Sequence, residues 1–166
     1  TTLMPVVFLE AGTRGSAQLL YAPTVVNFSK YKDLSSVNQA VFFRLRYPFT
    51  KLKLGLDAFY LTSSGLFISN DQGGFAQQST FLTRIFGEYP VADKVMVELM
   101  EESVWQNTDP GGSQMEHSLK GRVYYQVTPS VKAGMSLKVG VYDAPAEDQV
   151  YQSLELSSSR RITDAL

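Results

Sequence analysis

Residues 37–47 read Val37-Asn38-Gln39-Ala40-Val41-Phe42-Phe43-Arg44-Leu45-Arg46-Tyr47, and their side chains alternate in character. One face of an extended chain would carry Val37, Val41, Phe43, Leu45 and Tyr47. The other face would carry Asn38, Ala40, Phe42, Arg44 and Arg46. A period of two is the pattern of a β-strand with one apolar and one polar face. The segment therefore predicts a strand whose two arginines lie opposite an apolar stripe.

The same alternation recurs along the chain. In residues 51–60, apolar residues at even positions alternate with Lys51, Lys53, Gly55 and Asp57. Segments 115–127 and 131–142 repeat the pattern, and no segment shows a convincing helical period. We predict an all-β chain of nine strands, at 6–13, 17–28, 37–47, 51–61, 77–88, 95–105, 115–127, 131–142 and 149–157.

The connections between these strands differ in length. Tight turns are predicted at 14–16, 48–50, 89–93, 128–130 and 159–164, and longer polar loops at 29–36, 62–76, 106–114 and 143–148. In an up-and-down chain every second connection lies at the same end, so one rim has short turns and the other has long loops. This asymmetry is typical of transmembrane β-barrels. The fold class we predict is an up-and-down antiparallel transmembrane β-barrel, or a segment of one, with about eight to ten strands.

Composition excludes several classes of protein. The 166 residues carry 15 Lys+Arg and 16 Asp+Glu, a net charge of -1, which argues against a nucleic-acid partner. The chain contains no cysteine and one histidine, which excludes disulfides, thiolate metal sites and sites with several histidines. No apolar run approaches the roughly 18 residues of a membrane helix. We expect no cofactor and no metal site.

The predicted strand count is odd, which creates a difficulty for closure. An open sheet edge in lipid leaves backbone groups without partners. We therefore expect residues 1–166 to form a single barrel domain or barrel segment that is incomplete at its C-terminus. A further strand, from the same chain or another subunit, would pair with 149–157, and 6–13 would not. The alternative is a miscounted, closed barrel of eight strands.

Three strand-turn-strand units carry a family resemblance, at residues 21–28, 41–56 and 122–134. Their form, with Arg-x-Tyr or Tyr before a short Thr/Pro-containing turn, resembles the porin-like outer-membrane β-barrel proteins of Gram-negative-type bacteria. Some of these are encoded beside exopolysaccharide-export genes. The resemblance covers about residues 17–157. It implies a cell-envelope location and a role in export or anchoring, and it implies no catalytic residue.

Charged residues gather on the predicted polar faces. If the apolar stripe meets lipid, the residues that line the lumen are Arg44, Arg46, Lys51, Lys53, Asp57, Arg84, Glu88, Glu98, Glu102, Lys120, Arg122, Lys132, Lys138 and Glu155. One interpretation is a water-filled pore whose charges select solutes. The others are a filled interior in which opposite charges pair, and the solvated face of a soluble sheet.

Three further patterns are interpreted in plain structural terms. His117 lies between Glu116 and Ser118, but strand neighbours point to opposite faces, so we predict an outward histidine near the lipid interface and no hydrolase triad. Residues 70–74 and 107–112 match no calcium-binding spacing and are interpreted as ordinary loops. Aromatic residues near strand ends predict girdles at the headgroup level: Tyr60, Tyr89, Trp105, Tyr125, Tyr142 and Tyr151.

These observations favour a non-catalytic outer-membrane β-barrel that acts as a pore or as a structural component of the envelope. Its expected partners are membrane lipid and additional barrel strands, with no nucleic acid. The alternative is a soluble antiparallel barrel or sandwich that binds a ligand or a protein partner.

Overall fold

The structure is a computed structural model that describes residues 2–3, 7–12, 14–27, 35–69, 72–109, 111–143, 145 and 147–160 of the chain. All regular elements in these residues are strands, and none is a helix long and apolar enough to span a membrane. The strands are β1 (Thr2–Leu3), β2 (Val7–Ala11), β3 (Ser16–Val26), β4 (Ser36–Pro48), β5 (Lys53–Ser69), β6 (Gln72–Ala92), β7 (Val95–Asp109), β8 (Gly112–Thr128), β9 (Val131–Asp143) and β10 (Gln149–Arg160).

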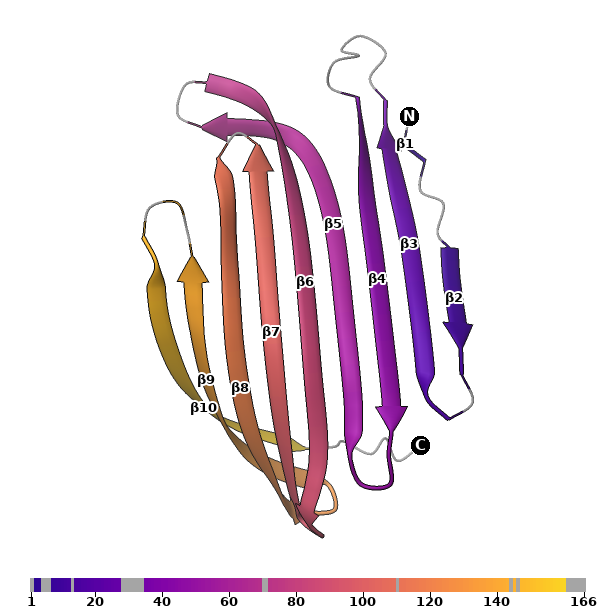
Figure 1. The fold of residues 1–166 in the computed structure, drawn as a ribbon, viewed down its shortest axis with the longest axis vertical. Coiled ribbons are helices and arrows are strands. Elements are labelled where there is room, and N and C mark those ends of the chain that lie inside the picture. Colours follow the sequence, from indigo (N-terminus) through magenta and orange to yellow (C-terminus); the bar gives the residue numbers. More distant parts are fainter. Residues whose placement is uncertain are drawn as a thin grey trace.

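The strands form one antiparallel sheet in which each strand from β3 to β10 pairs with its neighbours in sequence (Figure 1). Both β1 and β2 pair with β3, at its opposite ends, so together they occupy one position in the sheet. The described strands thus fill the nine positions predicted from the sequence, in an up-and-down order. The prediction of an all-β, up-and-down antiparallel fold is confirmed.

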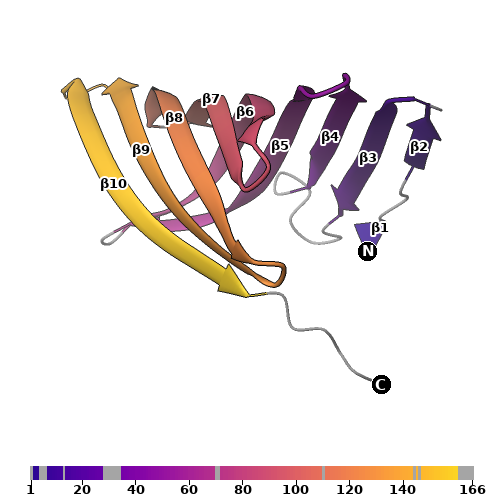
Figure 2. The ribbon, with the colours of Figure 1, turned by 90° about the horizontal axis from the view of Figure 1, so that it is seen from below.

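The sheet is curved and open. Figure 2 shows it as a trough, with β2 and β10 at opposite edges. Within the described residues β10 pairs only with β9 and β2 only with β3, so the pairing of 6–13 with 149–157 that would close the sheet is absent. The presence of further strands beyond this edge stays a prediction.

Two of the predicted long loops are wrong, because their residues continue the strands. β5 and β6 extend through most of 62–76, and β7 and β8 extend through most of 106–114. The upper part of the β5–β6 hairpin bends over at the long-loop rim in Figure 1. Neither segment has the period-two alternation of the other strands: 106–114 is polar throughout apart from Pro and Gly, and in 62–69 the apolar residues Leu66, Phe67 and Ile68 are consecutive. The residues at the two hairpin tips that were considered for calcium, Asn70, Asp71 and Pro110, lie outside the described part.

The sheet is a single layer without an apolar core. No apolar side chain in the described part is buried, and the large exposed ones lie on the face opposite Arg44 and Asp57. The polar face is the concave one, because its side chains are crowded: Asp57, Ser118 and Ser136 are among the most buried residues described. A two-sheet sandwich, which buries apolar residues between its layers, is therefore wrong for the described part of the chain.

Candidate functional site

Register places charged residues of alternating sign in one row across the concave face. Arg44 on β4 is paired with Asp57 on β5, which is paired with Arg84 on β6, which is paired with Glu102 on β7. Side chains directly opposite on antiparallel strands are close enough to interact. Arg44 Nε donates to Asp57 Oδ1 at 3.1 Å, and Arg84 Nη2 donates to Glu102 Oε2 at 2.5 Å. The row thus forms salt bridges between neighbouring strands.

Asp57 is the most connected carboxylate of the β4–β5 region. Arg46 lies one row away and reaches the same carboxylate at 2.8 Å, so two guanidinium groups share it. Asp57 is only 7% exposed, in agreement with its enclosure by the two guanidinium groups. The Arg46 guanidinium also lies 4.5 Å from the ring centre of Phe86 on β6. Gly55 lies between Arg46 and Phe86 in the register, and because it has no side chain, the Phe86 ring occupies the space where its Cβ would stand.

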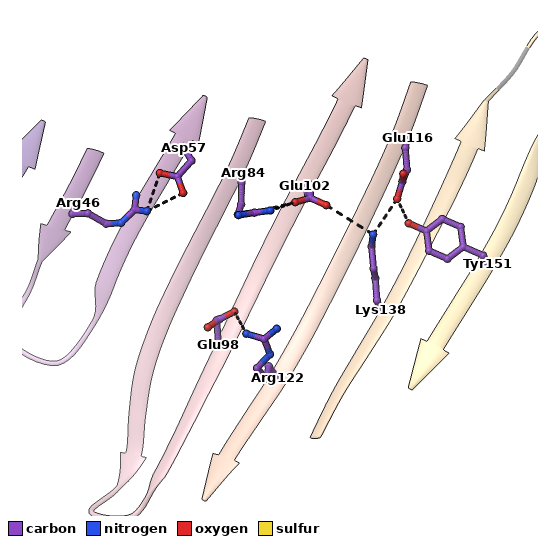
Figure 3. A network of polar contacts seen from close by, with 9 residues as sticks. All are labelled: Arg46, Asp57, Arg84, Glu98, Glu102, Glu116, Arg122, Lys138 and Tyr151. Carbon is purple, nitrogen blue, oxygen red and sulfur yellow. Dashed lines mark hydrogen bonds and ion pairs between the residues drawn. The ribbon is translucent and has the colours of Figure 1, made fainter. Parts of the chain in front are cut away.

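A second set of contacts continues towards the C-terminal edge, and we name Arg84, Glu102, Lys138, Glu116 and Tyr151 the concave network (Figure 3). Lys138 Nζ lies 3.0 Å from Glu116 Oε1 and 3.9 Å from Glu102 Oε1. The Tyr151 hydroxyl donates to Glu116. The concave network therefore joins β6, β7, β8, β9 and β10 through polar side chains alone.

Closer to the short-turn rim, two more ion pairs lie on the same face. Arg122 Nη1 donates to Glu98 Oε1 at 3.2 Å and to the Tyr124 hydroxyl at 2.6 Å. Lys120 Nζ donates to Glu155 Oε2 at 2.9 Å. Glu98 and Arg122 face each other in register, whereas Lys120 and Glu155 reach each other across β9.

An open hollow lies between these ion pairs. It has a volume of about 420 Å³ and extends from Asp57 on β5 to Lys138 on β9. Its walls include Glu98, Glu102 and Arg122. Opposite charges thus face the same space. No group of three or more potential metal ligands occurs in the described part of the chain.

The structure places all of the predicted polar-face residues that belong to strands on the concave face, and most of them are paired. Ten of them form salt bridges: Arg44, Arg46, Asp57, Arg84, Glu98, Glu102, Lys120, Arg122, Lys138 and Glu155. No salt bridge of Lys53, Glu88 or Lys132 occurs among the described residues, and Lys51 lies in the turn before β5.

Two members of the concave network were missing from the predicted set. Glu116 follows the inward alternation of its strand, so the periodicity signal for it was present. Tyr151 was predicted as a girdle residue, together with Tyr142, and both predictions are wrong. Tyr142 donates to Gln114 at 2.5 Å and Tyr151 donates to Glu116, so both rings face the concave side. A position near a strand end indicates how deep in the membrane a side chain lies, but it does not indicate to which face of the sheet the side chain points.

The convex face carries the remaining aromatic residues in two bands. Tyr60, Phe81 and Trp105 lie in one cross-sheet row near the long-loop rim. Tyr89 and Tyr125 lie near the short-turn rim and are about half exposed. The girdle prediction for Tyr60, Tyr89, Trp105 and Tyr125 agrees with these positions. Apolar side chains fill most of the band between the two rims.

His117 faces outward on β8, as predicted, while Glu116 and Ser118 face the concave side. The two neighbours of His117 in sequence therefore do not form a triad with it. Its contact is with the neighbouring strand: His117 Nδ1 lies 2.7 Å from Ser103 Oγ on β7. Sequence periodicity gave the face of each residue but not this pairing, which depends on the register of β7 and β8.

No family model matches the chain, and no curated protein matches it. Among solved structures, the chain is similar to those of OmpT, an outer membrane protein of Vibrio cholerae. Its loop L8 deletion mutant matches with a TM-score of 0.65 and 12% identity over 96% of this chain and 53% of that chain. In-vitro folded OmpT matches with a TM-score of 0.65 and 11% identity over 96% of this chain and 55% of that chain.

Outer-membrane expressed OmpT gives a third match, with a TM-score of 0.62 and 12% identity over 95% of this chain and 54% of that chain. The present chain thus spans about half the length of the structures that it matches. At this level of identity the likeness concerns the fold. The described residues have the up-and-down antiparallel fold of an outer-membrane β-barrel.

Proposed function

We propose that this sheet is part of the wall of a bacterial outer-membrane β-barrel, and that its concave face lines a water-filled passage for small solutes. The observation that carries the proposal is the contrast between the two faces. The concave face holds a connected set of charged side chains, whereas the convex face exposes Leu, Val and aromatic residues. A charged interior and an apolar exterior are the arrangement that a membrane pore requires.

A passage is favoured over a filled interior by the width of the sheet. Small barrels of about eight strands have room only for side chains, whereas wide barrels leave an aqueous channel. The described strands already fill nine positions without closing, and the chain covers only about half of the barrel proteins that it resembles. A barrel completed from this curvature would be wider than the side chains of the concave network can fill.

The balance of charge predicts weak selectivity. Eight basic and six acidic side chains lie on the concave face of β4–β10, so the charges cancel except for a small basic excess: Arg44, Arg46, Lys53, Arg84, Lys120, Arg122, Lys132 and Lys138 against Asp57, Glu88, Glu98, Glu102, Glu116 and Glu155. Small cations and anions should therefore pass at comparable rates, with a slight preference for anions. The exopolysaccharide association finds no support in the comparisons and stays a prediction from the sequence resemblance alone.

The test is single-channel recording of the full-length protein in planar lipid bilayers. The proposal expects a stable conductance whose reversal potential shifts towards anion selectivity in the double variant Glu98→Gln, Glu102→Gln. Leu137→Ala on the convex face is the matched control and should leave the reversal potential unchanged. A correctly folded, inserted protein with no conductance above that of the bare bilayer would show a structural wall without a passage.

A further inference from the structure

A second hollow lies at the short-turn rim, where β3 begins, β4 ends and β5 begins. It has a volume of about 500 Å³, and we name it the rim hollow. Its lining includes Arg14, Ser16, Arg46, Lys53, Phe86 and Glu88. The rim hollow shares only Phe86 and Glu88 with the hollow of about 420 Å³ that extends from Asp57 to Lys138, so the two are neighbouring but separate sites.

Two glycines shape the rim hollow. A Cβ at Gly15 would lie 2.8 Å from the carbonyl oxygen of Arg46, so a larger residue could not bring the start of β3 this close to β4. Arg14, next to Gly15 in the chain, thereby reaches the rim hollow. At Gly55 the Phe86 ring fills the place of the missing Cβ, and the Arg46 guanidinium lies 4.5 Å from the centre of that ring. Phe86 and Arg46 thus form a packed wall.

The basic side chains at the rim hollow have too few carboxylates to pair with. Arg46 shares one carboxylate, that of Asp57, with Arg44. Within the described residues, the salt bridges include none formed by Arg14, Lys53 or Glu88, although Lys53 and Glu88 are paired in register. These four basic and two acidic side chains leave an excess of two positive charges.

The neighbouring hollow is different, because its charges balance. Four basic side chains line it, Arg84, Lys120, Arg122 and Lys138, against the four acidic ones Asp57, Glu88, Glu98 and Glu102. The positive charge of the concave face therefore collects at the rim hollow. A concave site lined mainly by one sign of charge concentrates ions of the opposite sign.

From these observations we infer that the rim hollow binds a dianionic phosphate group, carried by a small organic molecule or free in solution. A phosphate monoester carries close to two negative charges at neutral pH, which matches the excess of two positive charges, whereas a carboxylate would neutralise only half of it. The inference deepens the proposed function and rests on it for the access of solutes to the concave face.

The residues of the rim hollow suit this ligand. An arginine guanidinium can bind two phosphate oxygens at once, and a lysine ammonium adds a compact charge. Arg14 and Lys53 supply these two groups, and the Ser16 hydroxyl adds a neutral donor. A volume of about 500 Å³ exceeds that of a phosphate group and lies within the usual range for small-molecule sites, so an organic part fits beside Phe86.

Isothermal titration calorimetry of the folded full-length protein in non-ionic detergent tests the inference with probes that differ in charge. Glucose 6-phosphate is expected to bind about tenfold more tightly than gluconate, which has a single negative charge, and glucose is expected not to bind. Inorganic phosphate distinguishes the two sources: equal affinity indicates free phosphate as the ligand, and lower affinity indicates a phosphate ester. Equal binding of gluconate and glucose 6-phosphate, or binding of neither phosphate probe, would overturn the inference.

Matched variants locate the site. Arg14→Gln combined with Lys53→Gln should weaken phosphate binding about tenfold, and Glu88→Gln should strengthen it about threefold. The control combines Lys51→Gln with Lys94→Gln, which removes two positive charges from turns at the same rim without touching the rim hollow. Equal weakening in both double variants would mean that the rim attracts anions only generally, and it would overturn the site. Unheated electrophoretic mobility shows that each variant is folded.

Conductance of the same preparations reports on the passage separately. Phosphate binding by a protein that does not conduct would refute the proposed function and leave the rim hollow as a phosphate site. A conducting protein that binds neither phosphate probe would refute the rim hollow alone.

Discussion

Glu102 on β7 and Lys138 on β9 form an ion pair of 3.9 Å although β8 lies between their strands. The residue between them on the concave face is Ser118, which is paired with Glu102 on one side and with Gly140 on the other. A short side chain at this position lets a lysine reach across a whole strand. In the same way, the absence of a side chain at Gly140 lets Tyr151 reach across β9 to Glu116 on β8. The short side chain of Ser136 lets Lys120 and Glu155 meet across the same strand.

Small concave residues therefore determine how far the polar contacts extend. A longer side chain at Ser118 or Gly140 would confine each ion pair to adjacent strands. The curvature of the sheet has the same effect as the small residues, because it brings concave side chains of alternate strands together. The concave network is thus a product of register, curvature and residue size together.

The first prediction concerns Asp57. Asp57→Ala removes the carboxylate that Arg44 and Arg46 share and leaves two guanidinium groups side by side. We expect the free energy of unfolding to fall by about 1–3 kcal/mol, the range for hydrogen bonds to charged groups. Equilibrium unfolding in denaturant, with the barrel in lipid vesicles, measures it. Lys53→Ala, which breaks no salt bridge, should change stability by no more than about 0.5 kcal/mol. Equal losses in both variants would contradict the importance of the shared carboxylate.

The second prediction concerns Gly140. A Cβ at this position would lie 2.5 Å from Tyr151 Cζ, so Gly140→Ala must displace the ring and break its hydrogen bond to Glu116. We expect a loss of about 0.5–1.5 kcal/mol, the net value of one such bond. Because both changes act on the same contact, Gly140→Ala and Tyr151→Phe should be strongly non-additive in a double-mutant cycle. Simple additivity would mean that Gly140 acts on the backbone and not through Tyr151.

Period-two alternation was enough to predict the strands and their faces, because a strand with one side in lipid and one in water has to alternate. Arg44, Asp57 and Lys138 were placed on the correct face for this reason. Their partners were not predictable, since pairing needs the register between strands, which alternation within one strand does not contain. The extensions of β5 and β6 were missed because their sequences do not alternate: 62–65 holds only small residues, and the apolar residues that follow, Leu66, Phe67 and Ile68, are consecutive. Tyr151 was assigned to the wrong face because the prediction used its position near a strand end and not its place in the alternation of the strand.

The third prediction tests the assignment of the faces. Leu54→Arg puts a charge on the convex face, where Leu54 is 41% exposed, and should cost about 2–4 kcal/mol in a bilayer if the site is near the midplane and less towards the interface. Lys53→Ser, one residue away on the concave face, should be nearly neutral. Refolding into lipid vesicles at a series of urea concentrations gives both values. A similar penalty at the two positions would mean that the convex face does not meet lipid.

The fourth prediction concerns catalysis. On the convex face of β7 and β8, the Ser103 hydroxyl donates its one proton to Glu101 Oε1 at 2.5 Å and lies 2.7 Å from His117 Nδ1. The proton therefore points to the carboxylate and not to the imidazole. A serine nucleophile needs a base in that position. We therefore expect no release of fatty acid from phospholipid vesicles by the folded full-length protein. Hydrolysis that Ser103→Ala abolishes would show that the protein is an enzyme.

The fifth prediction concerns orientation. Barrels of this class have short turns on the periplasmic side and longer connections outside. In this chain the β6–β7 and β8–β9 turns are short, and Asp93 in the first of them is exposed. Asp109 is an exposed residue at the opposite rim, at the end of β7. We expect Asp109→Cys to react with a membrane-impermeant maleimide in intact cells, and Asp93→Cys to react only after the outer membrane has been opened. Lys132→Cys lies on the concave face. If that face lines a water-filled passage, a small maleimide should label this cysteine in intact cells, and a polymer-linked maleimide should not. Labelling of Asp93→Cys alone in intact cells would reverse the topology.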